Sequence, residues 1–273
     1  MSAGRRAFRE ALPPAAIALA VTLLRLAGER LGWSAVWFSR DTGGVVPSRL
    51  GWVVGITWLA LPVGAWFAGR LVRAGDRPTS TGRATAQALG AAALLYVLLR
   101  LLPALRLGFP AFLFPIWATA VVCAWIAWRA WPALGRTLLA YGVLSRLPVV
   151  VVMLLALRGH WGTHYDYADA AAFVRQMSLA AAFVWLALVP QLVFWTAYTV
   201  VAGTAAGTLT AALLRPRPAD AAGRLRVGGG AGRGPHGPAR AGRRVAGRPR
   251  RRLSALPVSL SAALLYDRAG ALP

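Results

Sequence analysis

Residues 137–157 read TLLAYGVLSRLPVVVVMLLAL, a run of 21 residues in which Arg146 is the only charged side chain. The hydrocarbon core of a bilayer is about 30 Å thick, and a helix of about 20 apolar residues crosses it. The whole chain has this character, because 58% of its 273 residues are hydrophobic and only 14% are charged. A soluble domain carries about 25% charged residues. The sequence therefore predicts a membrane protein rather than a cytosolic enzyme or a nucleic-acid-binding domain.

Five further stretches are similarly apolar, and each is predicted to be helical because lipid offers the backbone no hydrogen-bonding partner. Together they make six, at residues 12–31, 51–72, 84–103, 110–131, 137–157 and 178–214. The predicted fold class is all-α, a polytopic transmembrane bundle of six helices in the lipid bilayer. The last stretch has 37 residues, and a straight helix of that length would measure about 55 Å. It must tilt, extend beyond the bilayer, or bend at Pro190 or at Gly203 and Gly207.

The arginines predict the orientation. All 31 basic residues are arginine, and 13 of them lie in 215–273. Of the other 18, nine fall on one side of the predicted bundle, six on the opposite side, and three inside the spans. Cytoplasmic segments carry the excess of positive charge, so we expect a multi-pass protein with both termini in the cytoplasm. The chain has no lysine and no asparagine, which indicates GC-rich coding and favours a bacterial inner membrane.

The chain divides into three predicted regions. Residues 1–11 form a basic cytoplasmic N-terminal arm, 12–214 the six-helix transmembrane domain, and 215–273 a tail rich in Arg, Gly, Pro and Ala. The tail has too little apolar surface to fold and is predicted to be disordered. A shifted reading frame in a GC-rich gene would give the same mixture, so a frameshift product without selected function is an alternative. A genuine tail is expected to lie on anionic lipid.

Several cofactors are excluded by residues that the chain lacks. Without lysine there is no P-loop for a nucleotide and no Schiff-base site for retinal. The three histidines, His160, His164 and His236, lie outside the strong spans, so no transmembrane haem is expected. The single cysteine, Cys123, lies in an apolar run and is predicted to be a packing residue.

Residues 158–169, RGHWGTHYDYAD, concentrate polar groups in a chain otherwise poor in them. His160 and His164 are four residues apart, so one helical turn would place both imidazoles on one side. With Asp166 and Asp169 they could bind a divalent metal. Alternatively, His164 acts as a catalytic base that Asp166 orients, at the outer membrane interface and without a metal.

A third interpretation of the same segment is an interface loop. Trp161, Tyr165 and Tyr167 are suited to the level of the lipid headgroups. Asp169 precedes AAAFV and is suited to cap the following helix. The sequence leaves the three interpretations open.

Arginines within the spans indicate a second candidate site. A charge at the bilayer centre costs about 2.5–3.5 kcal/mol on insertion scales, so it should face protein or water. Arg25 has Glu29 one turn later and is expected to pair with it. Arg146 lies deepest and precedes Pro148, and it is suited to a lipid phosphate, a carboxylate solute or Glu29. The predicted ligand-binding set consists of Arg25, Glu29 and Arg146, together with Gln191 and Tyr198 from a polar strip in the last span.

Small residues recur at four-residue spacing in two spans. Gly64 and Ala68 lie in the second span, and Gly203 and Gly207 lie in the last. This spacing lets helices approach closely, either within the chain or across a homodimer.

Two hypotheses about function follow. In the first, the chain is a non-enzymatic component of the membrane, such as a subunit for a membrane protein partner or a protein that handles small solutes or lipids. In the second, it is a membrane enzyme or metal-binding protein with its site at the outer interface. The sequence leaves open whether the protein is an enzyme, and it does not exclude a homo-oligomer.

Overall fold

The computed structural model describes residues 3–38, 54–167 and 175–214. Within these ranges every regular element is a helix, which confirms the predicted all-α fold. The predicted tail at 215–273, residues 39–53 before α2, and Asp169 lie outside the described residues.

Most of the predicted spans are present as long helices. The elements are α1 (Ala3–Arg30), α2 (Ala60–Arg73), α3 (Thr81–Leu101), α4 (Leu113–Ala130) and α5 (Pro132–Gly159), followed by a last composite helix over Leu179–Leu213. Five of them, all except α2, are long and apolar enough to cross a membrane. These helices support a membrane protein.

The second predicted span is a shorter helix than expected. Residues 51–72 were predicted to be helical throughout, but α2 begins at Ala60 and has 14 residues. A helix of that length measures about 21 Å and does not cross a bilayer core unaided. Pro62 lies in the first turn of α2, a position that tolerates proline because the amides there have no helical partner.

The last span is irregular on both sides of Pro190, which is one of the alternatives that the sequence leaves open. It consists of α7 (Leu179–Ala182), the π-helical segments η4 (Phe183–Leu188) and η5 (Pro190–Trp195), and α8 (Thr196–Leu213). Pro190 cannot donate to the carbonyl of Leu186, and its ring clashes with that group in a regular helix. The Tyr167 hydroxyl donates to this carbonyl instead, at 2.8 Å.

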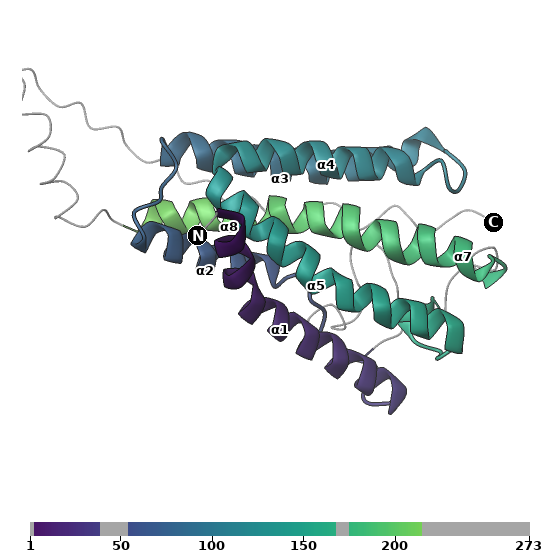
Figure 1. The fold of residues 1–273 in the computed structure, drawn as a ribbon. Helices are drawn as coiled ribbons and strands as arrows, with labels where there is room; N and C mark the ends of the chain where they lie inside the picture. The colour runs from purple at the N-terminus through teal and green to yellow at the C-terminus, as the bar shows by residue number, and fades with distance from the viewer. Residues whose placement is uncertain (1–2, 39–53, 168–174, 215–273) are drawn as a thin grey trace, which may run out of the picture. The chain divides into compact units, whose positions relative to one another are not determined.

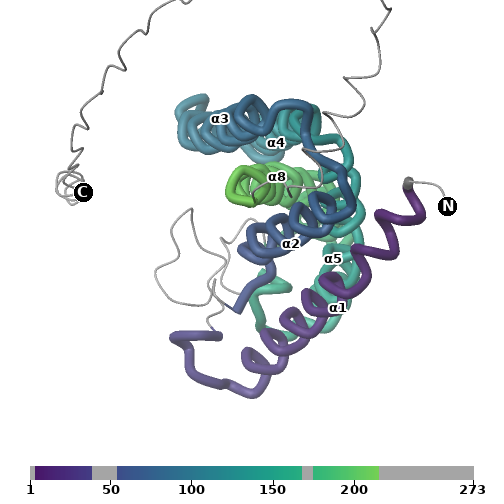
Figure 2. Tube along the Cα trace, turned by 90° about the vertical axis from the view of Figure 1, so that its left-hand side faces the viewer, coloured from purple at the N-terminus to yellow at the C-terminus, as the bar shows by residue number. Residues whose placement is uncertain are grey.

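Helix α8 lies at the centre of the bundle. It contacts α2, α3, α4 and α5, while α1 packs mainly on α5. Figures 1 and 2 show α3 and α4 side by side, with α8 between this pair and α2. One buried cluster includes Phe67, Leu138 and Tyr141 beside α8. A second includes Cys123 and Val201, which confirms that Cys123 is a packing residue.

The small residues of α2 and α8 bring these two helices into contact within the chain. A Cβ atom added at Gly64 would overlap the backbone of Gly203. One added at Gly207 would lie 3.0 Å from the Gly64 carbonyl oxygen and 3.2 Å from Ala68 Cβ. Gly203 and Gly207 therefore serve packing, and α8 runs through both without interruption.

Polar contacts hold the connections together at each end of the bundle. Trp131 Nε1 donates to Asp76 at 2.9 Å, and Arg77 donates to the Leu214 carbonyl at 3.3 Å. This end is named the arginine-rich end for Arg5, Arg6, Arg9, Arg70, Arg73, Arg77, Arg83, Arg129 and Arg136. At the opposite end Arg30 donates to the Trp161 carbonyl at 2.9 Å.

Gly64→Ala is expected to lower the free energy of unfolding by about 1–3 kcal/mol, because the methyl group forces α2 and α8 apart. Gly90→Ala is the control, since Gly90 lies in α3 with nothing within 4 Å of an added Cβ. Its expected effect is zero or slightly stabilising. Reversible unfolding in mixed micelles measures both variants, and an equal effect of the two would contradict the close contact.

Candidate functional site

A tight turn after α5 is built around one carboxylate. Helix α5 ends where His160 adopts a left-handed conformation, with φ 48°. Asp166 then accepts three hydrogen bonds: from the Gly162 amide at 2.9 Å, the Thr163 amide at 2.6 Å and the Thr163 hydroxyl at 2.9 Å. Both carboxylate oxygens of Asp166 are used in this way. Its structural role is to shape the turn η3 (His164–Asp166).

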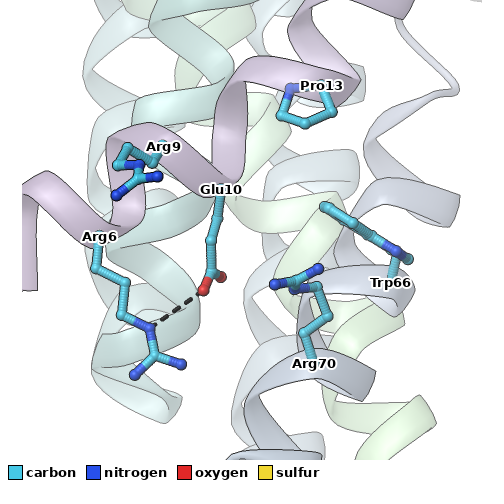
Figure 3. Close-up of a pocket in the computed structure, with 6 residues that line it drawn as sticks. All are labelled: Arg6, Arg9, Glu10, Pro13, Trp66 and Arg70. Carbon is cyan, nitrogen blue, oxygen red and sulfur yellow. Dashed lines mark hydrogen bonds and ion pairs between the residues drawn. The ribbon is translucent and has the colours of Figure 1, made fainter.

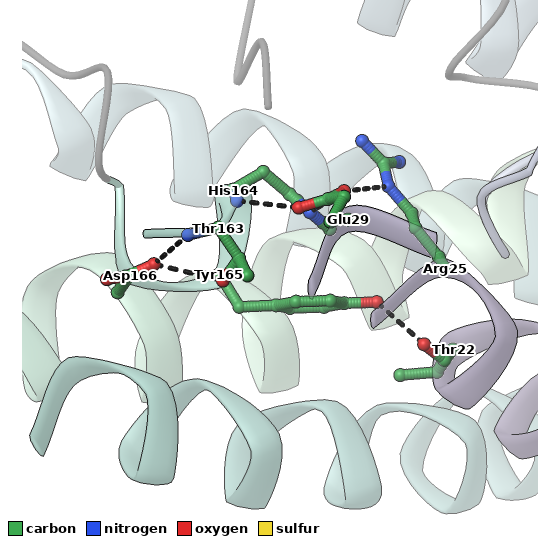
Figure 4. Close-up of polar contacts among 7 residues, drawn as sticks. All are labelled: Thr22, Arg25, Glu29, Thr163, His164, Tyr165 and Asp166. Carbon is green, nitrogen blue, oxygen red and sulfur yellow. Dashed lines mark hydrogen bonds and ion pairs between the residues drawn. The ribbon is translucent and has the colours of Figure 1, made fainter. Parts of the chain in front are cut away.

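The turn presents His164 to a buried carboxylate on α1. Glu29 accepts a hydrogen bond from the His164 amide at 2.9 Å, and its other oxygen lies 2.6 Å from His164 Nδ1. That second oxygen also accepts from Arg25 Nε at 2.9 Å. The Glu29 side chain is fully buried. Figure 4 shows Glu29 between the imidazole and the guanidinium, as the centre of this cluster.

Tyr165 makes a further contact with α1, about two turns before Glu29. Its hydroxyl donates to the Thr22 carbonyl at 3.2 Å, and its ring centre lies 3.8 Å from that of His164 (Figure 4). Burial raises the pKa of Tyr165 well above its usual value and that of Tyr167 to about 12. Both hydroxyls therefore stay protonated and act as donors.

The His164 imidazole is held in its neutral form. Burial lowers its pKa, the hydrogen bond to Glu29 opposes this, and the nearby positive charge of Arg25 lowers it further. A carboxylate can only accept hydrogen bonds, so Nδ1 carries the proton and Nε2 keeps its lone pair. This arrangement suits either an anchored structural histidine or a general base.

The predicted metal ligands do not gather around one point. The structure places His160 and Asp166 beside Tyr167 and Arg175 around a cavity of about 500 Å³. His164 instead binds Glu29. No group of three or more His, Cys, Asp or Glu side chains is placed to share a metal within 3–38, 54–167 and 175–214. Asp169 lies outside those ranges, so the metal site stays a prediction.

The predicted ligand-binding residues separate into two places. Arg25 and Glu29 belong to the cluster described above, and the suggested pairing of Arg146 with Glu29 is wrong because Glu29 binds Arg25 and His164. Gln191 accepts a hydrogen bond from Arg146 Nη1 at 3.3 Å. Tyr198 lies nearby, with its ring centre 5.8 Å from that of Trp195.

Arg146 is buried without a negative partner. The residue is 4% exposed, and its guanidinium carbon lies 5.2 Å from the centre of the Trp195 ring. Its Nε has no hydrogen-bond partner. No salt bridge in the part of the chain that the structure describes involves Arg146. Among the described residues, its guanidinium contacts the amide oxygen of Gln191 and the face of the Trp195 ring.

Trp195 belongs to the polar strip that the sequence indicates in the last span, where it follows Gln191 by four residues. One contribution was missed by the sequence analysis, the backbone carbonyl of Thr22. Thr22 could not have been found, because it contributes a backbone carbonyl, which every residue has.

Comparison of the chain with protein-family models, curated proteins and solved structures finds no match.

Glu29→Ala is expected to lower the free energy of unfolding by about 3–5 kcal/mol, because it removes the fully buried carboxylate that Arg25 and the His164 amide and imidazole share. Glu10→Ala is the matched control on the same helix. The Arg6–Glu10 pair has the same four-residue spacing, at 3.1 Å, but the Arg6 side chain is 54% exposed. Its loss should cost less than about 1 kcal/mol. Equal losses in the two variants would show that Glu29 does not anchor the loop.

The stability should also depend on pH through His164. Its folded-state pKa is lowered, so below about 6.5 the unfolded chain takes up the proton more readily. The unfolding temperature should therefore fall as pH falls through this value. Glu29, Arg25 and Asp166 are the charged groups acting on the ring. His164→Asn should flatten the dependence and His160→Asn should not; an unchanged slope in His164→Asn would contradict the assignment.

Proposed function

We propose that the protein is a multi-pass component of the bacterial inner membrane that binds the anionic group of a small solute or lipid at Arg146. Carboxylates and phosphates are the ligand classes that a guanidinium recognises best. We further propose that the arginine-rich end faces the cytoplasm, which places both termini there.

The observation that carries this proposal is the buried guanidinium without a carboxylate. An unpaired charge inside a protein costs several kcal/mol, and buried charges are therefore normally paired. Arg25 meets this expectation with Glu29 at 2.9 Å. Arg146 has Gln191 and Trp195 instead. An anion on Arg146 would supply both the missing charge and an acceptor for the unpartnered Nε.

The helix beside Arg146 is suited to admit a ligand. Gln191 and Trp195 both lie in the π-helical segment η5, and π-helical turns occur frequently at functional sites. Gln191 is itself held by Met153, at 3.6 Å from the sulfur, a weak acceptor that an anion could replace.

Binding rather than catalysis is favoured at Arg146 by the chemistry of its contacts. Gln191, Trp195 and Met153 supply no general base and no nucleophile. A protein that recognises an anion there acts as a carrier, sensor or subunit, and association with a membrane protein partner or with a second copy fits this role.

A second candidate function, a membrane enzyme at the outer interface, is favoured by the His164–Glu29 contact. A carboxylate on Nδ1 orients an imidazole and increases its basicity, and it does the same for a metal-ligating histidine. The metal content of the purified full chain, compared with that of His164→Ala, distinguishes a metal-dependent enzyme from a metal-free one. Stoichiometric metal that disappears in His164→Ala would support a metal site, and its absence from both would leave only the metal-free enzyme.

Arg146→Gln is expected to stabilise the unliganded protein slightly, because it removes a buried unpaired charge. The same change should abolish stabilisation by an anion. The probes are octyl phosphate and octanoate, with octanol as the neutral control, added to the full chain in a mild detergent. At about 100 times its Kd, a bound anion should add about 2.7 kcal/mol to the stability of the wild type.

Arg100→Gln is the matched control, since Arg100 also lies in a span but is exposed on α3. It should keep the response to both anions. Equal responses of wild type and Arg146→Gln would contradict the proposal, as would a response to octanol as large as that to octyl phosphate.

A further inference from the structure

Arg146 lies at a depth where a surplus charge is poorly tolerated. It is near the middle of the 28-residue helix α5 and is 4% exposed. Val149 and Met153, three and seven residues later on the same face of the helix, are buried apolar residues. A charge near the centre of a bilayer is strongly disfavoured unless it faces protein or water that stabilises it. The total charge of this site therefore restricts what it can bind.

The protein contributes one charge to the site, that of Arg146 itself. Among the described residues, the ionisable groups that interact electrostatically with Arg146 are three tyrosines, Tyr141 in α5, Tyr165 in η3 and Tyr198 in α8. A phenol loses its proton only well above neutral pH, so these groups carry no charge between pH 6 and pH 8. Gln191 is also uncharged and offers Arg146 one amide oxygen.

Another arginine shows that stacking on an indole does not replace a counter-charge. The guanidinium carbon of Arg70 lies 5.2 Å from the centre of the Trp66 ring, as that of Arg146 does from Trp195. Arg70 is exposed and lines a cavity of about 610 Å³ at the arginine-rich end (Figure 3), where water can solvate its charge. Arg146 makes the same contact but is buried, so an anion is the group that would balance it.

The guanidinium of Arg146 presents one edge that matches a single anionic group. Nη1 donates to Gln191 at 3.3 Å, and the Trp195 ring lies over one face. Nε is buried and has no hydrogen-bond partner. The N–H bonds of Nε and Nη2 are parallel and lie in the plane of the group, as the two tips of a fork. Two oxygens of one carboxylate or one phosphate can accept from this edge together.

We propose, on the basis of the function proposed above, that the ligand of Arg146 carries one negative charge, on a carboxylate or a phosphodiester joined to an apolar chain. A phosphate monoester with two negative charges binds only after it takes up a proton from solution. One negative charge makes the site neutral, whereas two would leave one charge unbalanced near the middle of α5. The apolar chain suits the side chains of Val149, Met153 and Trp195.

The test compares three probes with the same eight-carbon chain: octanoate, methyl octyl phosphate and octyl phosphate. Each is titrated into the full chain in a mild detergent, and its Kd is obtained from the rise in unfolding temperature. Partition of each probe into micelles without protein is measured in parallel. Octanoate and methyl octyl phosphate are compared at pH 8, where both carry one charge, and the tighter of the two identifies a free acid or a phosphodiester as the natural ligand.

The pH dependence of octyl phosphate gives the decisive number. Its second proton has a pKa of about 6, so at pH 8 only about 1% of it carries a single charge. If that form alone binds, its apparent Kd is about 100 times that of methyl octyl phosphate at pH 8 and about twice at pH 6. Methyl octyl phosphate keeps one charge at both pH values, so the ratio cancels any effect of pH on the protein.

A variant that carries its own negative charge tests the same inference without a ligand. Gln191→Glu should raise the unfolding temperature of the unliganded chain and remove its response to octanoate, because the new carboxylate balances Arg146. Gln87→Glu is the matched control in α3, where Gln87 donates to the Ile126 carbonyl at 2.7 Å. A carboxylate cannot donate, so this variant should unfold at a lower temperature and keep the response to octanoate.

Equal Kd values for octyl phosphate and methyl octyl phosphate at pH 8 would overturn the restriction to one charge. The proposed function would survive that result if Arg146→Gln still removed both responses. Responses that persist in Arg146→Gln would overturn the function and the restriction together. A fall in unfolding temperature of Gln191→Glu as large as that of Gln87→Glu would also contradict a site that lacks one negative charge.

Discussion

The close contact between α2 and α8 is the constraint on which the rest of the bundle depends. At Gly64 and Gly203 the two backbones meet without intervening side chains, and α8 in turn contacts α3, α4 and α5. Helices in lipid are held by close packing and hydrogen bonds, because lipid chains are as apolar as the side chains themselves. A short helix such as α2 can therefore belong to the bundle only by fitting tightly against its central member.

Two carboxylates near the end of α5 have different structural roles. Asp166 satisfies amides within its own turn, and this local structure directs the His164 amide and imidazole toward Glu29. Glu29 then joins the turn to α1. One buried carboxylate thus holds an arginine of its own helix and a loop 135 residues away in sequence. The same contacts leave Nε2 of His164 unprotonated, so a structural anchor and a potential base are the same group.

The arginines of the protein occupy three different environments. Arg25 is neutralised by Glu29, Arg70 stacks on Trp66 beside a cavity, and Arg146 is buried with an amide and an indole. A guanidinium attracts anions in proportion to the charge and hydrogen-bonding capacity that its neighbours leave unused. This is why the proposed ligand belongs to Arg146, while the Arg25–Glu29 pair is assigned a structural role.

The sequence by itself determined the all-α fold, its membrane-like character and the approximate limits of four long helices, whereas α1 begins at Ala3 rather than at residue 12. It left Pro190 as one of several places where the last helix could be irregular. These predictions depend on hydrophobicity and on the hydrogen bonds that each segment must satisfy along its own length. It also predicted the Arg25–Glu29 pair, because four-residue spacing on one helix is a local property. Only the tertiary structure decided that Glu29 meets His164 and that Arg146 meets Gln191, because such contacts depend on how separate helices pack.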